Sequence, residues 1–280
     1  MLVNQIYKQY LFSLSFLYDK EEAVRITEWI FEEVLSVHFT QVKYHFNQVL
    51  TDSQLSILNE QLMRLKNAEP VQYVLGYAFF MDLKLSVNKH VLIPRPETEE
   101  LVALILKENK DFSGSLMDVG TGSGCIALSL SKGWPQGKIF ASDVLKDSLE
   151  VAKENAEGLH LPCTFIHDSI LDPVFEKYPM LDIIVSNPPY IVKEEQDQMH
   201  DNVLKHEPHL ALFVSHSPLE FYDAILQVAI KKLNKGGVVY FELNPLFAQD
   251  VLQLSRDLGF NHVKLHKDVS GKIRFLSCSR

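Results

Sequence analysis

Residues 115–128 read SLMDVGTGSGCIAL, in which an apolar run leads into three glycines and then into a second apolar run. This is the order of a buried strand, a tight turn and the start of a helix, and it lets the backbone approach a ligand closely. A Cβ at Gly120, Gly122 or Gly124 would fill space that the ligand needs. We therefore predict an α/β fold whose ligand site lies where this strand ends.

The same alternation of strands and helices continues through residues 97–280. We predict helices over 97–109, 146–157, 218–234 and 246–258 and another from Ser123, and strands over 115–119, 138–143, 163–168, 181–186, 237–243, 262–267 and 272–278. Strands that are apolar throughout and separated by amphipathic helices favour a mainly parallel sheet covered on both faces. The last two strands are close in sequence, so they are expected to form an antiparallel edge. The prediction is an α/β domain with a mainly parallel sheet.

Residues 1–69 have a different period. Their apolar side chains recur every three or four positions, so they lie on one stripe of each helix, and no strand alternation competes with this pattern. The pattern predicts a small helical bundle. Asp19 and Asp52 precede two of the helical stretches and are expected to act as N-caps.

Residues 70–96 separate these two regions and are rich in β-branched and aromatic residues. Phe80, Leu83, Leu85 and Val87 suggest strand alternation, with a break near Gly76 and turn residues at positions 88 and 89. We predict a hairpin-like linker here, between the helical bundle and the α/β domain.

Composition excludes several classes of protein. The chain has 280 residues, 46% of them hydrophobic, and a formal net charge of −9, with acidic residues in excess on both sides of residue 90. Stable nucleic-acid binding is therefore not expected. The three cysteines are too few for a disulfide framework or a cysteine metal site, and the longest apolar runs, such as LVALIL at 101–106, are too short to cross a membrane. With no secretion signal in view, we expect a cytoplasmic protein. We also expect a monomer that binds no metal.

Acidic residues near the glycine loop indicate a nucleoside cofactor. Asp143 ends the second strand, where its carboxylate can accept hydrogen bonds from both hydroxyls of a ribose. The next strand ends in His167-Asp168-Ser169, where a side chain can meet the amino group of an adenine. A dinucleotide and S-adenosylmethionine both satisfy these features. Asp118, just before the glycines, favours S-adenosylmethionine, because it suits a cationic amino group and would repel a pyrophosphate.

The fourth strand runs directly into Asn187-Pro188-Pro189-Tyr190. Two prolines remove two N–H donors and fix two φ angles, which holds the neighbouring oxygens rigidly. The Asn187 side-chain oxygen and the Pro188 carbonyl can each accept one hydrogen of a planar amide or exocyclic amine, and Tyr190 can lie on the planar group. Such a site orients a weak nucleophile without a strong base. A rigid turn with no ligand is the simpler alternative.

These motifs resemble the signature of the release factor glutamine methyltransferase family (PrmC, also called HemK), whose members are class I methyltransferases. The likeness rests on the glycine loop at 118–128, the NPPY motif, and the stretches 70–76, 93–99 and 207–212. NPPY is shared with amino-methyltransferases that act on DNA and RNA, whereas the sequence PRPETE at 94–99 is much more specific to this family.

The resemblance implies a helical substrate-docking domain over 1–69, a hairpin linker over 70–96 and a Rossmann-like methyltransferase domain over 97–280. It implies N5-methylation of the glutamine in the Gly-Gly-Gln motif of class 1 peptide-chain release factors, with S-adenosylmethionine as donor and S-adenosylhomocysteine as product. Asn187, Pro188 and Tyr190 would be the catalytic residues, with Pro189 beside them at the substrate. The expected cofactor-lining residues are Asp118, Gly120, Thr121, Gly122, Gly124, Asp143, Asp168 and Asn187.

Some features stay open at this point. Asn244 and Pro218 stand where family members often have glycine-rich sequence, which leaves the neighbouring loops uncertain. Arg95 suits either a contact with the release factor or the cofactor, or a structural ion pair. His200, His206 and His209 have no metal-ligand spacing. The alternative functions are a nucleic-acid amino-methyltransferase and a non-catalytic module that binds S-adenosylmethionine and regulates a partner.

Overall fold

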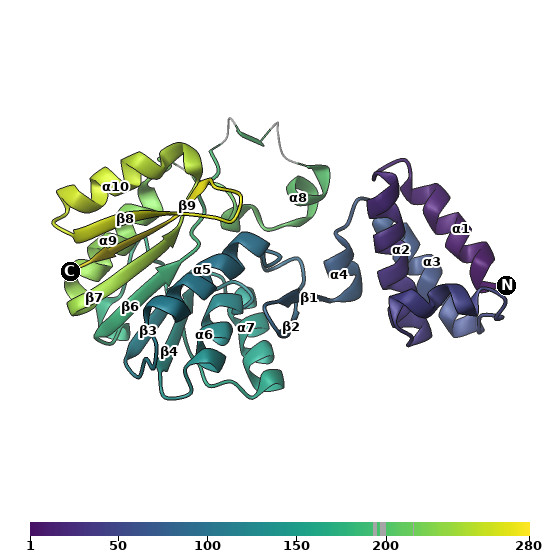
Figure 1. The fold of residues 1–280 in the computed structure, drawn as a ribbon, viewed down its shortest axis with the longest axis horizontal. Helices are drawn as coiled ribbons and strands as arrows, with labels where there is room; N and C mark the ends of the chain where they lie inside the picture. Colours follow the sequence, from purple (N-terminus) through teal and green to yellow (C-terminus); the bar gives the residue numbers. More distant parts are fainter. Residues whose placement is uncertain (193–194, 197–199, 215) are drawn as a thin grey trace. The chain divides into compact units, whose positions relative to one another are not determined.

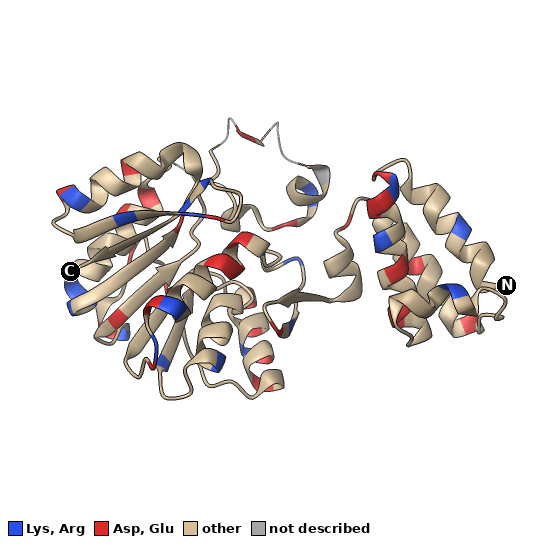
Figure 2. Ribbon diagram, viewed as in Figure 1, with Lys and Arg blue, Asp and Glu red and all other residues tan. Residues whose placement is uncertain are grey.

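The computed structural model describes residues 1–192, 195–196, 200–214 and 216–280 (Figure 1). The described residues form two compact units. One consists of Met1–Gly76 with His200–His206, and the other lies within Tyr77–Met199 and Glu207–Arg280. We call them the helical unit and the sheet unit. None of the described helices is long and apolar enough to cross a membrane. Basic and acidic residues are both scattered over the two units (Figure 2).

The helical unit has the predicted bundle. Its elements are α1 (Val3–Leu14), α2 (Lys20–Leu35), the 3-10 helix η1 (Phe39–His45), α3 (Asp52–Lys66), α4 (Val71–Leu75) and α8 (Asp201–His206). Its core is made of apolar residues at the predicted spacing, among them Ile6, Ile26, Ile30, Leu58 and Leu62. The N-cap at Asp19 is confirmed, because its carboxylate accepts from the amides of Glu21 and Glu22 at 2.9 Å. At α3 the cap is Thr51, one residue before the predicted Asp52.

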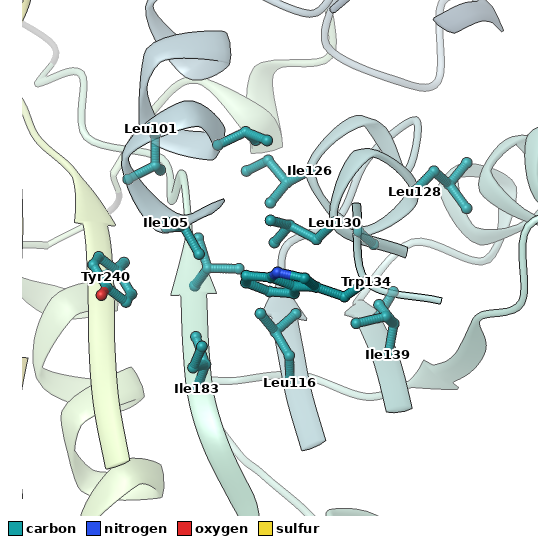
Figure 3. Packing of buried hydrophobic residues seen from close by; sticks show 14 of the residues in the cluster. Leu101, Ile105, Leu116, Ile126, Leu128, Leu130, Trp134, Ile139, Ile183 and Tyr240 are labelled. Carbon is teal, nitrogen blue, oxygen red and sulfur yellow. The ribbon is translucent and has the colours of Figure 1, made fainter. Parts of the chain in front are cut away.

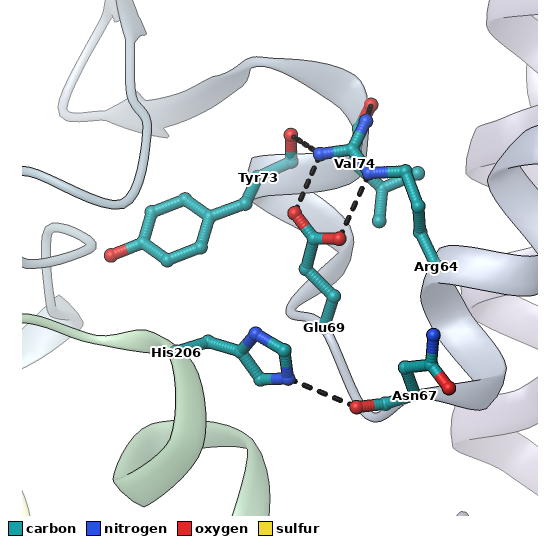
Figure 4. A network of polar contacts seen from close by, with 6 residues as sticks. All are labelled: Arg64, Asn67, Glu69, Tyr73, Val74 and His206. Atoms are coloured by element: carbon teal, nitrogen blue, oxygen red, sulfur yellow. Dashed lines mark hydrogen bonds and ion pairs between the residues drawn. The ribbon is translucent and has the colours of Figure 1, made fainter.

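Arg64 joins α3 to α4 (Figure 4). Its guanidinium donates to both carboxylate oxygens of Glu69 at 2.9 and 2.6 Å. It also donates to the carbonyls of Tyr73 at 2.9 Å and Val74 at 3.2 Å. Carbonyls in the last turn of a helix have no partner within that helix, so Arg64 satisfies the end of α4. The helix at α4 is an addition to the predicted linker, which we expected to be extended there.

The hairpin itself follows directly. Strands β1 (Tyr77–Phe80) and β2 (Leu83–Ser86) pair antiparallel around a turn at residues 81–82. The alternation is as predicted, with Phe80, Leu83 and Leu85 all buried. The linker also turns at residues 89–90, near the predicted position, but this second turn lies beyond the hairpin.

The sheet unit is the predicted α/β domain. Its strands are β3 (Ser115–Val119), β4 (Lys138–Asp143), β5 (Thr164–His167), β6 (Leu181–Ser186), β7 (Leu233–Glu242), β8 (Asn261–Lys267) and β9 (Ile273–Ser279). They form one seven-stranded sheet in the order β5-β4-β3-β6-β7-β9-β8. The pairs from β5 to β7 are parallel, and β9 pairs antiparallel with both β7 and β8. The mainly parallel sheet and its antiparallel edge are therefore confirmed.

Helices cover both faces of this sheet. Helices α5 (Pro96–Glu108), α6 (Cys125–Gly133) and α7 (Lys146–Leu159) pack on one face, in a cluster that includes Leu116, Ile139 and Trp134 (Figure 3). Helices α9 (Glu220–Lys232) and α10 (Ala248–Asp257) pack on the other, against Met117 and Ile184. Successive residues of a strand point to opposite faces, so a strand with both faces covered must be apolar throughout.

Candidate active site

Candidate functional residues lie at the carboxyl ends of neighbouring strands of the sheet. Val119 of β3 is paired with Ser142 of β4 and with Ser186 of β6, so the glycine loop, Asp143 and Asn187 come directly after adjacent strands. The strand order reverses direction between β3 and β6. Open α/β sheets bind their ligands at such a point, beyond the carboxyl ends of the strands.

The glycine loop adopts a backbone that favours glycine. Gly120, Gly122 and Gly124 have φ angles of +73°, +54° and +83°. A Cβ at Gly120 or Gly122 would meet no described protein atom within 4 Å, so the space beside them is open. Gly124 differs, because a Cβ there would come 3.2 Å from Leu128 and 3.3 Å from Ala152. Its small size therefore serves the packing of α6 against α7, and its contact with the cofactor stays a prediction.

Asp143 holds the glycine loop in place. Its Oδ2 accepts a hydrogen bond from the Gly122 amide at 3.0 Å, and its Oδ1 accepts one from the Leu145 amide at 2.9 Å. Burial raises the pKa of Asp143. A carboxylate has about four lone-pair positions, so each oxygen can accept a further hydrogen bond from a ribose hydroxyl.

Asp118 has an unsatisfied oxygen. Its Oδ2 accepts from Thr121 Oγ1 at 2.7 Å and from the Ala127 amide at 3.2 Å, whereas the buried Oδ1 has no partner among the described residues. Burial raises the pKa of Asp118 to about 7. A buried carboxylate oxygen without a donor is costly, and an ammonium group would supply both the donor and the opposite charge. The site therefore fits the amino-acid end of S-adenosylmethionine.

The carboxylate of Asp168 accepts hydrogen bonds from other groups of the protein. Lys177 Nζ donates to Oδ1 at 2.7 Å, and the Val174 amide donates to Oδ2 at 2.9 Å. The Asp168 amide donates to the Asp143 carbonyl at 3.1 Å, which ties the two strand ends together. The residue thus lies beside the predicted ribose position, and its role at the adenine stays a prediction.

Asn187 is the first of three side chains that are joined by hydrogen bonds. Its Nδ2 donates to Thr98 Oγ1 at 3.1 Å, and Thr98 donates in turn to Glu242 Oε2 at 2.7 Å. The Oδ1 of Asn187 has no hydrogen bond among the described residues. Tyr190 donates to Glu242 Oε1 at 3.4 Å. Burial raises the pKa of Glu242 to about 7 and also raises that of Tyr190.

Sequence reasoning did not find three residues of this site. Thr98 and Glu242 are both buried, and the contact between them joins positions 144 residues apart. Asn155 of α7 is the third. Its Nδ2 donates to the carbonyls of Ser123 at 2.9 Å and Ser86 at 3.0 Å, and its Oδ1 accepts from the Ser86 amide at 2.7 Å. It fixes the glycine loop to the hairpin, but a single asparagine in an amphipathic helix gives no sequence signal for this.

Arg95 makes a structural ion pair. Its guanidinium lies 2.7 Å from Glu207 Oε1, and the Glu207 carboxylate, which is almost completely buried, also accepts from the Ile93 amide at 3.3 Å. Of the two interpretations of Arg95, the structure supports this one. Asn244 caps the 3-10 helix η5 (Pro245–Phe247), since its Oδ1 accepts from the Leu246 amide at 3.0 Å.

His206 and His209 lie in different units, and His200 precedes α8 in the same unit as His206. His206 belongs to the helical unit, where its Nε2 donates to the Asn67 carbonyl at 2.9 Å (Figure 4). His209 packs edge-on against Phe213 in the sheet unit. In the part of the chain that the structure describes, no group of three His, Cys, Asp or Glu side chains is arranged to hold a metal ion.

Known proteins match both units. Residues 13–76 match the family described as PrmC N-terminal domain, and residues 98–211 match the methyltransferase small domain. The release factor glutamine methyltransferase of Bacteroides thetaiotaomicron is 39% identical over 269 residues, which is 96% of each chain. The chain belongs to the release factor glutamine methyltransferase family. The resemblance predicted from the motifs is thereby confirmed.

Another member of this glutamine methyltransferase family, from Lactococcus lactis subsp. lactis, is 39% identical over 267 residues, covering 91% of this chain and 98% of the relative. Among solved structures, a methyltransferase from Pyrococcus furiosus has a TM-score of 0.54 at 21% identity, covering 79% of this chain and 98% of that chain. This structural likeness supports the fold. As a member of a methyltransferase family, the chain is an enzyme, as predicted.

Proposed function

We propose that the chain methylates the N5 side-chain nitrogen of the glutamine in the Gly-Gly-Gln motif of class 1 peptide-chain release factors, with S-adenosylmethionine as the donor. Membership of the family supports this substrate. The observation that carries the chemistry is the orientation of Asn187. Its Nδ2 donates a hydrogen bond to Thr98, so its Oδ1 is left as an acceptor next to two prolines.

The methyl donor has one task here. S-adenosylmethionine supplies a methyl group on a positively charged sulfur, which is an activated electrophile. Asp118 would hold its ammonium group, Asp143 its ribose, and Gly120 and Gly122 leave room beside the backbone. These residues bind and orient, and they take no part in proton transfer.

The NPPY turn would handle the substrate amide. The Asn187 Oδ1 and the Pro188 carbonyl would each accept one N–H hydrogen of the glutamine, and Tyr190 would pack on its plane. Both acceptors stabilise positive charge that grows on the nitrogen during transfer. An amide nitrogen has a delocalised lone pair, so orientation contributes most of the rate and no strong base is needed. The proton leaves after the methyl group has been transferred.

The remaining assignments belong to the same proposal. The helical unit docks the rest of the release factor, the protein works as a monomer in the cytoplasm, and it forms no stable complex with nucleic acid. The acidic excess of the sequence supports the last point, because nucleic-acid binding relies on lysine and arginine contacts to phosphates.

Radiolabelled cofactor tests these assignments. The enzyme is incubated with methyl-labelled S-adenosylmethionine and with a class 1 release factor, the same factor with its Gly-Gly-Gln glutamine changed to alanine, or duplex DNA. We expect label on the intact factor, located by mass spectrometry at that glutamine. Label on DNA would indicate the nucleic-acid amino-methyltransferase, and cofactor binding without any transfer would indicate the regulatory module.

A further inference from the structure

Glu242 is linked by hydrogen bonds to both functional side chains of the NPPY motif, to Tyr190 directly and to Asn187 through Thr98. It lies at the end of β7 and is 2% exposed, beside β6, whose end Ser186 pairs with Phe241. Its Oε2 accepts from Thr98 Oγ1 at 2.7 Å, and its Oε1 accepts from the Tyr190 hydroxyl at a longer 3.4 Å. One buried carboxyl group is thus joined to Tyr190 directly and to Asn187 through a single hydroxyl.

The chemistry of this chain fixes which end of the Asn187 amide faces the substrate. A carboxylate can only accept hydrogen bonds, and a threonine hydroxyl has one hydrogen to donate. Because Thr98 donates that hydrogen to Glu242, its oxygen can only accept from Asn187. The NH2 end of Asn187 therefore turns toward Thr98 at 3.1 Å, and the oxygen end is directed away from it.

We propose that Glu242 is a positioning residue for methyl transfer, acting through Thr98 to keep the Asn187 oxygen, rather than its NH2 group, toward the substrate amide. This inference rests on the proposed function, in which that oxygen accepts a glutamine N–H. If the amide of Asn187 were reversed, its NH2 group would face the N–H of the substrate glutamine. The glutamine would then lose the Asn187 oxygen as its acceptor. Tyr190 is held in place by the same carboxyl group.

Ionisation of Glu242 is part of the arrangement. Burial raises its pKa to about 7 against the opposing effects of Thr98, Arg274 and Tyr190, while Glu97 raises it further. The Tyr222 hydroxyl bonds to the Glu242 carbonyl at 3.1 Å. Once protonated, Glu242 can donate to Thr98, which frees the threonine hydrogen to bond the Asn187 oxygen. Methyl transfer should therefore become faster as the pH rises through about 7.

Two substitutions at Thr98 separate positioning from packing. Thr98→Val has nearly the same shape but no hydroxyl, whereas Thr98→Ser keeps the hydroxyl and loses a methyl group. We expect Thr98→Val to lower kcat by about 10- to 100-fold, the scale of a misplaced catalytic group, with the cofactor Kd changed less than about threefold. Thr98→Ser should keep most of the activity. Wild-type kcat in Thr98→Val, or equal loss in both variants, would overturn the inference.

Glu242→Gln tests the carboxyl group itself. We expect a loss of kcat similar to that of Thr98→Val and a flatter dependence of kcat on pH between 6 and 8. The matched control is Glu108→Gln, because Glu108, the last residue of α5, accepts at 2.9 Å from the hydroxyl of Tyr240, which lies two residues before Glu242 in β7, and belongs to a hydrogen-bond pair separate from the one that holds Asn187. That variant should behave as the wild type. If Glu242→Gln keeps both the wild-type kcat and its pH dependence, Glu242 does not position the motif.

A measurement without the release factor keeps this inference separate from the proposed function. The side-chain amide signals of Asn187 in a 15N-labelled protein are assigned by their loss in Asn187→Ala. They should shift in Thr98→Val and Glu242→Gln and stay in place in Glu108→Gln. Failure of the wild-type enzyme to methylate the release factor would remove the proposed function. Unchanged Asn187 signals in Thr98→Val and Glu242→Gln would remove the positioning role.

Discussion

Gly124 and Ala152 are packed so closely that a Cβ on the glycine would lie 3.3 Å from the Cβ of the alanine. The contact presses the start of α6 against α7, directly behind the glycine loop. It also shows that the three glycines of the loop serve two purposes. Gly120 and Gly122 leave space open, whereas Gly124 allows two helices to approach.

Gly124→Ala should destabilise the enzyme by about 1–3 kcal/mol, because it combines a left-handed backbone with a crowded neighbour. Urea unfolding measures the loss. The matched control is Gly259→Ala, since Gly259 has the same φ of +83° and no described atom within 4 Å of its Cβ position. The control should lose less stability, because only backbone strain acts there. Equal losses would mean that crowding at Gly124 has no effect.

Asn155→Ala should weaken both stability and cofactor binding. The substitution removes three hydrogen bonds and leaves the buried Ser123 carbonyl without this donor, at a cost of about 2–3 kcal/mol. The glycine loop also loses its anchor to the hairpin. Calorimetric titration with S-adenosylmethionine and urea unfolding measure the two effects.

Asn109→Ala is the control for that experiment. The Asn109 side chain also donates two hydrogen bonds, to the Ile105 carbonyl at 2.9 Å and the Tyr240 hydroxyl at 3.0 Å, but it does not contact the glycine loop. It should lose stability and keep its cofactor affinity. If the Asn155 variant also keeps full affinity, the anchor has no influence on the loop.

Asn187→Ala should lower the rate of methyl transfer far more than cofactor affinity. The loss of one preorganised acceptor costs about 100- to 1000-fold in kcat. Asn234→Ala serves as the control, because the Asn234 amide donates to Asp182 at 2.8 Å near the start of β7. Single-turnover kinetics and calorimetric titration give the rate and the affinity. A rate and an affinity that fall together would contradict the role assigned to the Asn187 oxygen.

Cofactor affinity should rise with pH through the ionisation of Asp118. The pKa of about 7 means that the carboxylate is mostly protonated at pH 5.5 and about half ionised at pH 7. An amino group stays largely protonated over this range, so the affinity for S-adenosylmethionine should increase roughly tenfold. Asp118→Asn should abolish the increase. 5′-Methylthioadenosine lacks the amino acid part, and a pH effect of the same size with this ligand would exclude Asp118 as its cause.

The same ionisation affects the stability of the free enzyme, with a fixed sign. The pKa of Asp118 is raised above its unfolded value of 3.8, so the folded state holds a proton that the unfolded chain has released. The contribution is complete below about pH 4 and is lost as the pH rises through about 7. In urea unfolding between pH 5 and 7, Asp118→Asn should lose less stability than the wild type. A parallel loss in both proteins would contradict the raised pKa.

The sequence predicts the framework of the sheet well and its side-chain network poorly. Strands β3, β4 and β6 have their predicted bounds because each is an apolar run with polar or glycine residues at its ends. The helix α4 is only five residues long and has no periodicity to detect. Contacts such as Thr98 with Glu242 depend on how α5 and β7 meet in space, and neither residue type signals the other along the chain.

The position of β9 has a consequence for how the sheet is completed during synthesis on the ribosome. Residues 273–279 are made after β8, yet they lie between β7 and β8 and supply the hydrogen bonds that attach β8 to the sheet. The parallel strands and their helices can assemble while the chain is still growing. β8 stays unpaired until β9, which joins it to the rest of the sheet, has emerged.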